Sequence, residues 1–173
     1  EELAKQFGRS RHCQIAELAG ILELEGMLDE EGKLVVSNEN SLLQTKYGLL
    51  LQKIFGEKQE ILQIMQTLHQ EPYRSRKINH RRADGMLVQQ TCCKRAFIRG
   101  AFMAAGSISD PNKSYHFEIV CHTLEQAQQL KELMEFFETE PKIVERKERM
   151  VVYLKEGSQI VDLLNVMEAY VSL

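Results

Sequence analysis

The chain has 173 residues, of which 43% are hydrophobic, and a formal net charge of −3. This composition excludes a disordered chain, and no apolar run approaches the ~20 residues of a membrane span. We therefore expect one domain or two closely joined halves, with no membrane partner.

The first half is predicted to contain four helices and two short strands. Ser10 is a suitable N-cap for the longest helix, and Gly26 ends it. A turn at Asp29–Gly32 precedes the strands, and Pro72 ends the last helix. The predicted elements are helix 1–7, helix 10–25, strand 33–36, strand 41–45, helix 46–55 and helix 57–69.

The second half is predicted to follow the order helix, two strands, helix, two strands, helix. Thr123 is a suitable N-cap for its middle helix, and residues 147–149 form the turn of a hairpin. The elements are helix 93–105, a brief strand after Gly106, strand 115–121, helix 124–138, strands 141–146 and 150–154, and helix 158–170.

The two long helices share small residues at a constant offset of 80. Cys13, Ala16, Gly20 and Gly26 correspond to Cys93, Ala96, Gly100 and Gly106. Glycine inside a helix costs roughly 1 kcal/mol relative to alanine, so Gly100 requires a packing explanation. Small residues four apart allow two helices to approach closely. We interpret the pattern as an internal duplication, with the helices in contact through Ala16, Gly20, Ala96 and Gly100.

The residues of these helices resemble a known family. Residues 18–26, Leu-Ala-Gly-Ile-Leu-Glu-Leu-Glu-Gly, resemble the LAGLIDADG motif of homing endonucleases. The second copy, residues 98–106, is more similar to the WhiA family of bacterial DNA-binding regulators. The long run from Cys92 to Val120 carries this resemblance, and segments 152–157 and 159–162 support it. The resemblance implies an α+β fold of two tandem α-β-β-α-β-β-α halves. A pseudo-twofold axis relates the halves, and the motif helices form their interface.

This resemblance divides the chain into residues 1–73, an incomplete first half, residues 74–91, a basic linker, and residues 92–173, the second half. The first half lacks a second hairpin, which suggests that natural segments are absent. WhiA proteins continue into a helix-turn-helix domain, and we expect none within this chain.

Catalysis in the LAGLIDADG family requires an acidic residue just before the final glycine of each motif, where carboxylates hold a divalent metal ion. Glu25 occupies this position in the first copy, but Ala105 occupies it in the second, and Met103 replaces the other motif acid. We therefore expect no enzymatic activity and no cofactor, with Glu25 as a vestigial acid.

The four cysteines leave two interpretations open. Cys92, Cys93, Cys121 and His122 could form a zinc site, but buried thiols in a reducing cytosol are favoured. We therefore predict no metal site.

The charge distribution favours a phosphate-bearing partner more than the net charge does. Residues 72–99 carry +7 and the remainder carries −10. Such asymmetry is typical of nucleic-acid binding, although a solvated linker gives the same pattern. The last predicted hairpin adds further cations, interleaved with glutamates. The DNA-binding candidates are Arg74, Arg76, Lys77, Arg81, Arg82, Lys142, Arg146, Lys147, Arg149 and Lys155.

Together these observations predict a non-catalytic LAGLIDADG-like domain of a bacterial transcriptional regulator of sporulation, cell division or the chromosome. We expect a cytoplasmic, nucleoid-associated monomer that binds duplex DNA weakly and electrostatically. A protein-interaction module is the first alternative, and a residual metal-dependent nuclease is the second.

Overall fold

The computed structural model describes residues 1–70, 82–109 and 115–168. Within this part, the first half of the chain forms a long helix, a short hairpin and two further helices. Its elements are η1 (Glu2–Lys5), α1 (Arg11–Glu25), β1 (Gly26–Leu28), β2 (Leu34–Val36), α2 (Ser41–Phe55) and α3 (Ile61–Thr67).

The second half repeats the helix and hairpin of the first and adds another hairpin and helix. Its elements are η2 (Gly85–Val88), α4 (Thr91–Ala105), β3 (Gly106–Ile108), β4 (Phe117–Cys121), α5 (Leu124–Phe136), β5 (Lys142–Arg146), β6 (Arg149–Leu154) and α6 (Gly157–Val166). This is the order predicted for the second half.

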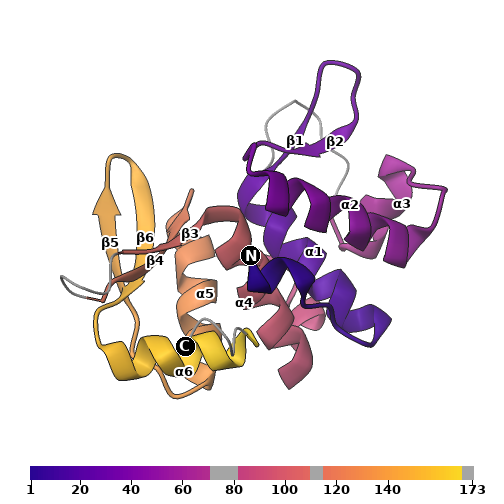
Figure 1. Cartoon of the computed structure of the whole chain (residues 1–173). Coiled ribbons are helices and arrows are strands. Elements are labelled where there is room, and N and C mark those ends of the chain that lie inside the picture. Colours follow the sequence, from indigo (N-terminus) through magenta and orange to yellow (C-terminus); the bar gives the residue numbers. More distant parts are fainter. Residues whose placement is uncertain (71–81, 110–114, 169–173) are drawn as a thin grey trace.

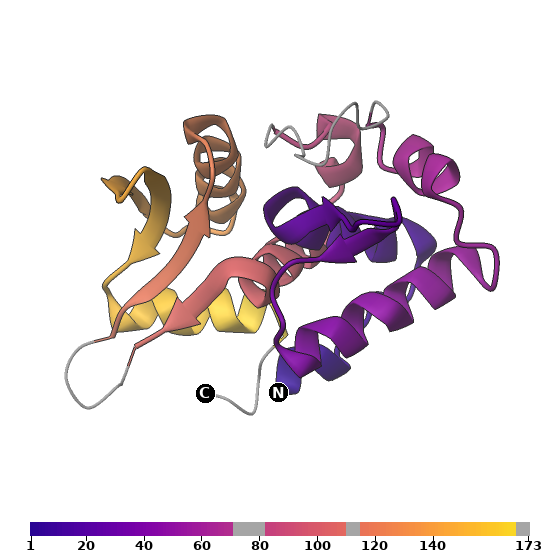
Figure 2. The same cartoon turned by 90° about the horizontal axis from the view of Figure 1, so that it is seen from above.

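Two antiparallel sheets flank the C-terminal ends of α1 and α4 from opposite sides (Figures 1 and 2). One contains β1 and β2, and the other has the strand order β3-β4-β6-β5. The central pairing sets Ile119 opposite Val152, and Val152 opposite Ile143. Helix α5 covers the face that carries these apolar side chains. The opposite face of the four-stranded sheet, here called the outer face, carries Glu118, Tyr153 and Lys142 in one cross-strand row.

Helices α1 and α4 pack backbone against backbone. A Cβ atom added to Gly20 would collide with the carbonyl oxygen of Phe97, and one added to Gly100 would collide with that of Glu17. The offset of 80 converts one contact into the other, as twofold symmetry requires. The predicted side-by-side packing of the motif helices is therefore confirmed, and glycine is needed at both positions because the obstacle is main chain.

The main error in the predicted fold is the strand at 41–45. These residues form the first turns of α2 instead. The side chain of Asn40 accepts hydrogen bonds from the backbone N–H groups of Leu42, at 2.9 Å, and Leu43, at 3.3 Å. This N-cap satisfies backbone donors at the start of the helix, which favours a helix over a strand at these residues. The strand that pairs with β2 is β1, which follows α1 directly.

Several predicted helices are shorter in the structure. The predicted helix at 1–7 is the single 3₁₀ turn η1, the one at 57–69 is α3, and the one at 158–170 is α6, with residues 169 and 170 outside the described part. The capping prediction at Thr123 is confirmed, because its hydroxyl accepts from Gln126 N at 3.3 Å. Gln126 in turn accepts from His122 N, one residue before the N-cap, so this is a variant of the capping box.

Candidate nucleic-acid interface

The two motif positions that would carry catalytic acids lie at the C-terminal ends of α1 and α4. Glu25 is half-buried there and accepts a hydrogen bond from the hydroxyl of Ser37, while Ala105 provides only a methyl group. A divalent metal ion of the nuclease type requires a carboxylate from each motif. These residues do not fit such a metal pair, because one of the two expected carboxylates is missing.

The same helix ends are joined by a reciprocal pair of hydrogen bonds between the halves. Asn38 Nδ2, which follows β2, donates to Ala104 O at 3.0 Å. His122 Nε2, which follows β4, donates to Leu24 O at 2.7 Å. Leu24 and Ala104 are equivalent under the offset of 80, so each half caps the motif helix of the other. These bonds satisfy terminal carbonyl groups that the helices leave unpaired.

A buried ion cluster lies between the motif helices. The Glu17 carboxylate contacts Lys46 Nζ at 2.8 Å through one oxygen and Arg99 Nε through the other. All three side chains are at most 3% exposed. Burial lowers the pKa of Lys46, although the charge of Glu17 opposes that effect. Arg99 also contacts Glu168 at 3.4 Å. Because Arg99 is buried and paired with carboxylates inside the domain, it cannot reach a phosphate.

Two of the four cations in the described part of the basic segment, Arg82 and Arg99, are paired with carboxylates. Arg82 forms two hydrogen bonds with Glu132 of α5, at 2.6 and 3.2 Å, on the helix side of the sheet. Lys94 donates to Val88 O at 2.7 Å, and the Arg95 guanidinium lies 5.1 Å from the ring centroid of Phe137. Four of the predicted DNA-binding cations, Arg74, Arg76, Lys77 and Arg81, lie outside the described residues.

The outer face of the four-stranded sheet gathers the remaining predicted cations around one hairpin. Because side chains alternate along β5 and β6, Lys142, Arg146 and Arg149 lie on this face. Lys155 follows the end of β6, and Lys147 is in the hairpin turn. Residues 147 and 148 form a two-residue turn with backbone φ angles of 50° and 64°. Positive φ at both positions matches the twist of the two flanking strands. These residues, here called the hairpin cations, are Lys142, Arg146, Lys147, Arg149 and Lys155.

The hairpin cations differ in how far other groups offset their charge. Arg146 forms a bidentate ion pair with Glu118, at 2.9 and 3.1 Å, and this pairing lowers the pKa of the Glu118 carboxyl. Arg149 donates to His122, and Lys155 lies 5.5 Å from the ring centroid of Tyr153. Lys142 and Lys147 are exposed. Four of the five cations are thus available to an incoming anion.

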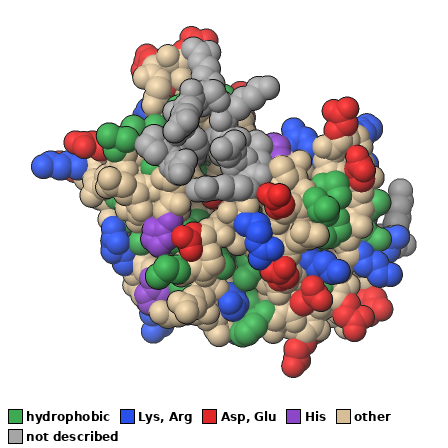
Figure 3. Space-filling model, turned by 180° about the vertical axis from the view of Figure 1, so that it is seen from behind, with side chains coloured by type: hydrophobic (Ala, Val, Ile, Leu, Met, Phe, Trp, Pro, Cys, Tyr) green, Lys and Arg blue, Asp and Glu red, His purple; other side chains and the backbone are tan. Residues whose placement is uncertain are grey.

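Elsewhere on the described surface, positive and negative side chains are mixed. Seen from behind, Lys and Arg side chains alternate with Asp and Glu side chains over the second half (Figure 3). On the smaller sheet, the β1–β2 turn carries the acids Asp29, Glu30 and Glu31. Among the described residues, the cations that group together on one face are therefore those of the outer face.

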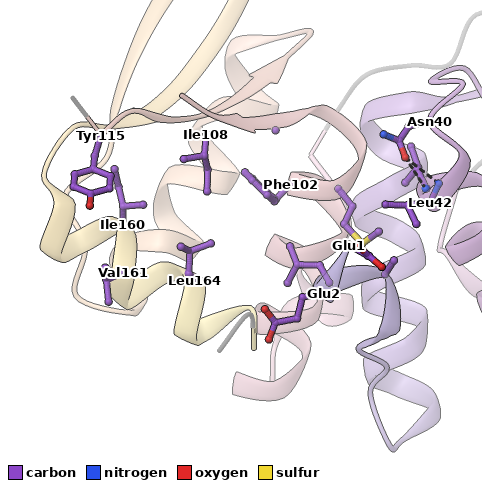
Figure 4. A pocket seen from close by; sticks show the side chains of 15 residues that line it. Glu1, Glu2, Asn40, Leu42, Phe102, Ile108, Tyr115, Ile160, Val161 and Leu164 are labelled. Atoms are coloured by element: carbon purple, nitrogen blue, oxygen red, sulfur yellow. Dashed lines mark hydrogen bonds between the residues drawn. The ribbon is translucent and has the colours of Figure 1, made fainter. Parts of the chain in front are cut away.

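An apolar groove of about 580 Å³ runs between η1 and α6 on the front of the molecule (Figure 4). Phe102 and Ile160 form part of its wall, while Glu1 and Glu2 line one end. Several large apolar side chains around it are exposed by 39–48%, namely Leu42, Ile108, Tyr115 and Val161. Such an exposed apolar surface is characteristic of a contact site.

The zinc set considered from the sequence does not form. Cys121 is fully buried in β4, and His122 bonds to the end of α1. Cys92 and Cys93 instead gather with His12 and Cys13. Sequence reasoning also missed Asn38, Glu118 and Tyr153. Alternation along β4 and β6 puts Glu118 and Tyr153 on the outer face, but the residues that they contact, Arg146 and Lys142, come from β5. Among the described residues, no helix has the length and apolar character needed to cross a membrane.

Comparison with solved structures identifies the fold. The chain superposes on full-length WhiA from Thermatoga maritima with a TM-score of 0.67 at 20% identity, over 96% of this chain and 58% of that one. It superposes on I-DmoI in complex with its target DNA with a TM-score of 0.54 at 12% identity, over 92% and 97% of the two chains. The chain therefore has the LAGLIDADG-type α+β fold, with two motif helices at its centre.

Sequence comparison identifies the family. Residues 94–173 match the model of the WhiA LAGLIDADG-like domain. The whole chain is 43% identical, over 203 residues, to a probable cell division protein WhiA of Lachnoclostridium phytofermentans. We therefore place the chain in the WhiA family. It spans 64% of the length of that relative, and the aligned stretch is longer than the 173 residues here, so the relative has additional residues within it.

Proposed function

We propose that this chain is a non-catalytic, DNA-facing domain of a bacterial regulator that acts in cell division or sporulation within the nucleoid. The observation that carries the proposal is the outer face, on a sheet beside the motif-helix ends. Exposed Lys142 and Lys155 lie next to Tyr153 there, and exposed Lys147 and Arg149 lie at the hairpin turn. The fold is shared with an endonuclease solved with its target DNA, and the WhiA relatives are named as cell division proteins. Both support a DNA-facing regulator.

The chemistry of the outer face suits phosphate contact more than base reading. Lysine and arginine side chains neutralise phosphates and release counterions, which provides affinity without sequence information. Only four described cations contribute, and Asp29, Glu30 and Glu31 oppose them on the other sheet. The proposed binding is therefore weak and one-sided, and sequence specificity would depend on other parts of the regulator.

Loss of nuclease activity is part of this proposal. Ala105 removes one motif carboxylate, and Ser37 occupies one oxygen of Glu25. Plasmid DNA incubated with Mg²⁺ or Mn²⁺ should remain uncut. Cleavage by the parent that disappears in Glu25→Gln would establish the residual nuclease instead.

The decisive experiment measures binding of the chain to a short duplex over a range of salt concentrations. Each phosphate contact contributes about −0.9 to the slope of log K against log salt, so three to four contacts give a slope of about −3 to −4. Arg149→Gln should reduce the magnitude of the slope by about 0.9 and weaken all sequences equally. Arg82→Gln is the matched control, because Glu132 already offsets that charge and Arg82 lies on the helix side. Equal effects of the two changes would refute the proposed face.

The apolar groove favours a second function, a contact with a protein partner. Its exposed rim residues Ile108 and Val161 can be changed to glutamate without disturbing the buried core. If no duplex binds even at low salt, the protein-interaction function takes first place. In that case, Val161→Glu should abolish partner capture in a pull-down, whereas Val144→Glu, an equally exposed position on the outer face, should not.

A further inference from the structure

Four side chains of metal-ligand type meet at the N-terminal ends of the two motif helices. His12 and Cys13 are the second and third residues of α1, and Cys92 and Cys93 are the second and third residues of α4. Their ligand atoms all lie within 4.8 Å of one another. His12 Nε2 is 3.3 Å from Cys92 Sγ. The offset of 80 relates His12 to Cys92 and Cys13 to Cys93, so the pseudo-twofold axis passes through the cluster.

Apolar packing explains only half of this arrangement. Cys13 and Cys93 are 5% and 3% exposed and pack with Ala16 and Ala96 in a small buried cluster. His12 and Cys92, however, are exposed, so burial of apolar surface does not hold them against the thiols. The side chains of consecutive helical residues point about 100° apart, so they normally diverge. They can face a common point when a second helix lies against the first. The close contact of α1 and α4 meets this condition.

The donor set matches a closed tetrahedral zinc site. Three cysteines and one histidine are a common structural set for Zn²⁺, with Zn–S near 2.3 Å and Zn–N near 2.0–2.1 Å. Tetrahedral angles then place the ligand atoms about 3.5–3.8 Å apart. The observed 3.3 Å between His12 and Cys92 is close to this spacing, and the 4.8 Å limit for the other pairs requires only small side-chain rotations. Ser10 Oγ, 3.1 Å from His12 Nε2, is the other polar contact of that ring, and Gln90 Oε1 lies 3.8 Å from Cys92 Sγ.

We propose that His12, Cys13, Cys92 and Cys93 bind one thiophilic divalent cation, best matched by Zn²⁺, that joins the two halves of the domain. Thiol protons leave as the metal binds, and the two helix N-termini stabilise the thiolate charge. The site lies about 12 residues, or roughly 18 Å, along the motif helices from Glu25 and Ala105. Its role is therefore structural, and it is separate from the motif acid positions.

The test uses the full chain, stripped of metal with a chelator under reducing conditions and titrated with Co²⁺. We expect one Co²⁺ per chain, a thiolate charge-transfer band, and the intense visible bands of tetrahedral cobalt. Zn²⁺ should displace the cobalt and raise the melting temperature. Elemental analysis of protein purified without chelator should find about one zinc per chain.

The variants separate this site from adventitious binding. Cys92→Ser and His12→Gln change exposed residues, so circular dichroism should show a retained fold. Each should weaken zinc binding by more than about 100-fold, because even outer-shell partners are worth 10–100-fold. Cys121→Ala removes the remaining cysteine and should leave the cobalt spectrum unchanged. Absence of the thiolate band, its survival in both exposed variants, or formation of a Cys13–Cys93 disulfide in place of metal binding would overturn the proposal.

Discussion

Replacing Gly100 by alanine tests the close packing on which the whole domain depends. The added methyl group would lie against the Glu17 carbonyl oxygen, well below the 3.0 Å that real Cβ atoms respect. The obstacle is main chain, so α1 and α4 must move apart. Overpacking of this kind costs typically 1–3 kcal/mol, and the rigid neighbour favours the upper end. Alanine recovers about 1 kcal/mol of helix propensity, which leaves a net loss of about 2 kcal/mol.

Gly48 provides the matched control. It also lies within a helix, α2, but it is exposed, and a Cβ added there meets nothing within 4 Å. Gly48→Ala should therefore stabilise the domain by about 0.5–1 kcal/mol. Thermal melts should place Gly100→Ala about 4–8 °C below the parent and Gly48→Ala about 1–4 °C above it, since 1 kcal/mol shifts Tm by about 2–4 °C at this size. A Gly100→Ala variant that melts with or above the parent would show that the helices are not in backbone contact.

Three further changes test other contacts between the halves or on the outer face. Glu17→Gln leaves Lys46 buried without its carboxylate partner and Arg99 with Glu168 as its remaining one, and should cost about 3–5 kcal/mol in urea unfolding; a cost below 1 kcal/mol would refute the buried cluster. Asn38→Ala removes a cross-half bond to Ala104 O and should cost about 1 kcal/mol, measured in the same way, whereas an unchanged midpoint would contradict that contact. The pKa of Glu118 is lowered in the folded state, mainly by Arg146, so its stabilisation is present above about pH 4.5 and is lost as pH falls through the folded pKa. Urea midpoints measured across that window should fall less steeply in Glu118→Gln than in the parent.

The packing of the motif helices could be predicted because it is a property of spacing. Identical small residues at one offset imply two equivalent helices, and interior glycines imply close approach. The order of elements in the second half could be predicted from local signals, namely the N-cap at Thr123 and the hairpin turn at 147–149. The strand at 41–45 was wrong because a five-residue segment is too short to show a distinct period, and the deciding signal, Asn40 as an N-cap, lies just outside it.

The free positive charge of the basic segment could not be predicted from the sequence, because two of its arginines form ion pairs with glutamates that are distant along the chain. Arg99 and Arg82 counted toward the basic segment, yet their partners are Glu17 and Glu132, 82 and 50 residues away. The zinc set that the sequence left open, Cys92, Cys93, Cys121 and His122, does not come together for a related reason, because the neighbours of Cys92 and Cys93 lie 80 residues earlier in the chain. The offset of 80 that relates the helices also relates His12 to Cys92, so the duplication carried the information about this cluster.

The contacts between the two halves are distributed along the full length of the motif helices. At the N-terminal ends lie His12, Cys13, Cys92 and Cys93, at the centre lie the glycine contacts and the Glu17 ion cluster, and at the C-terminal ends lie the bonds from Asn38 and His122. Contacts at three levels resist both sliding and rotation, so the two sheets are held at a fixed angle. The described parts of the two sheets are unequal, one with the hairpin cations and the other with an acidic turn, so the pseudo-twofold axis does not relate their charges. The proposed DNA contact is therefore a one-sided docking, in which the catalytic symmetry of the LAGLIDADG fold is lost while its central helix packing is retained.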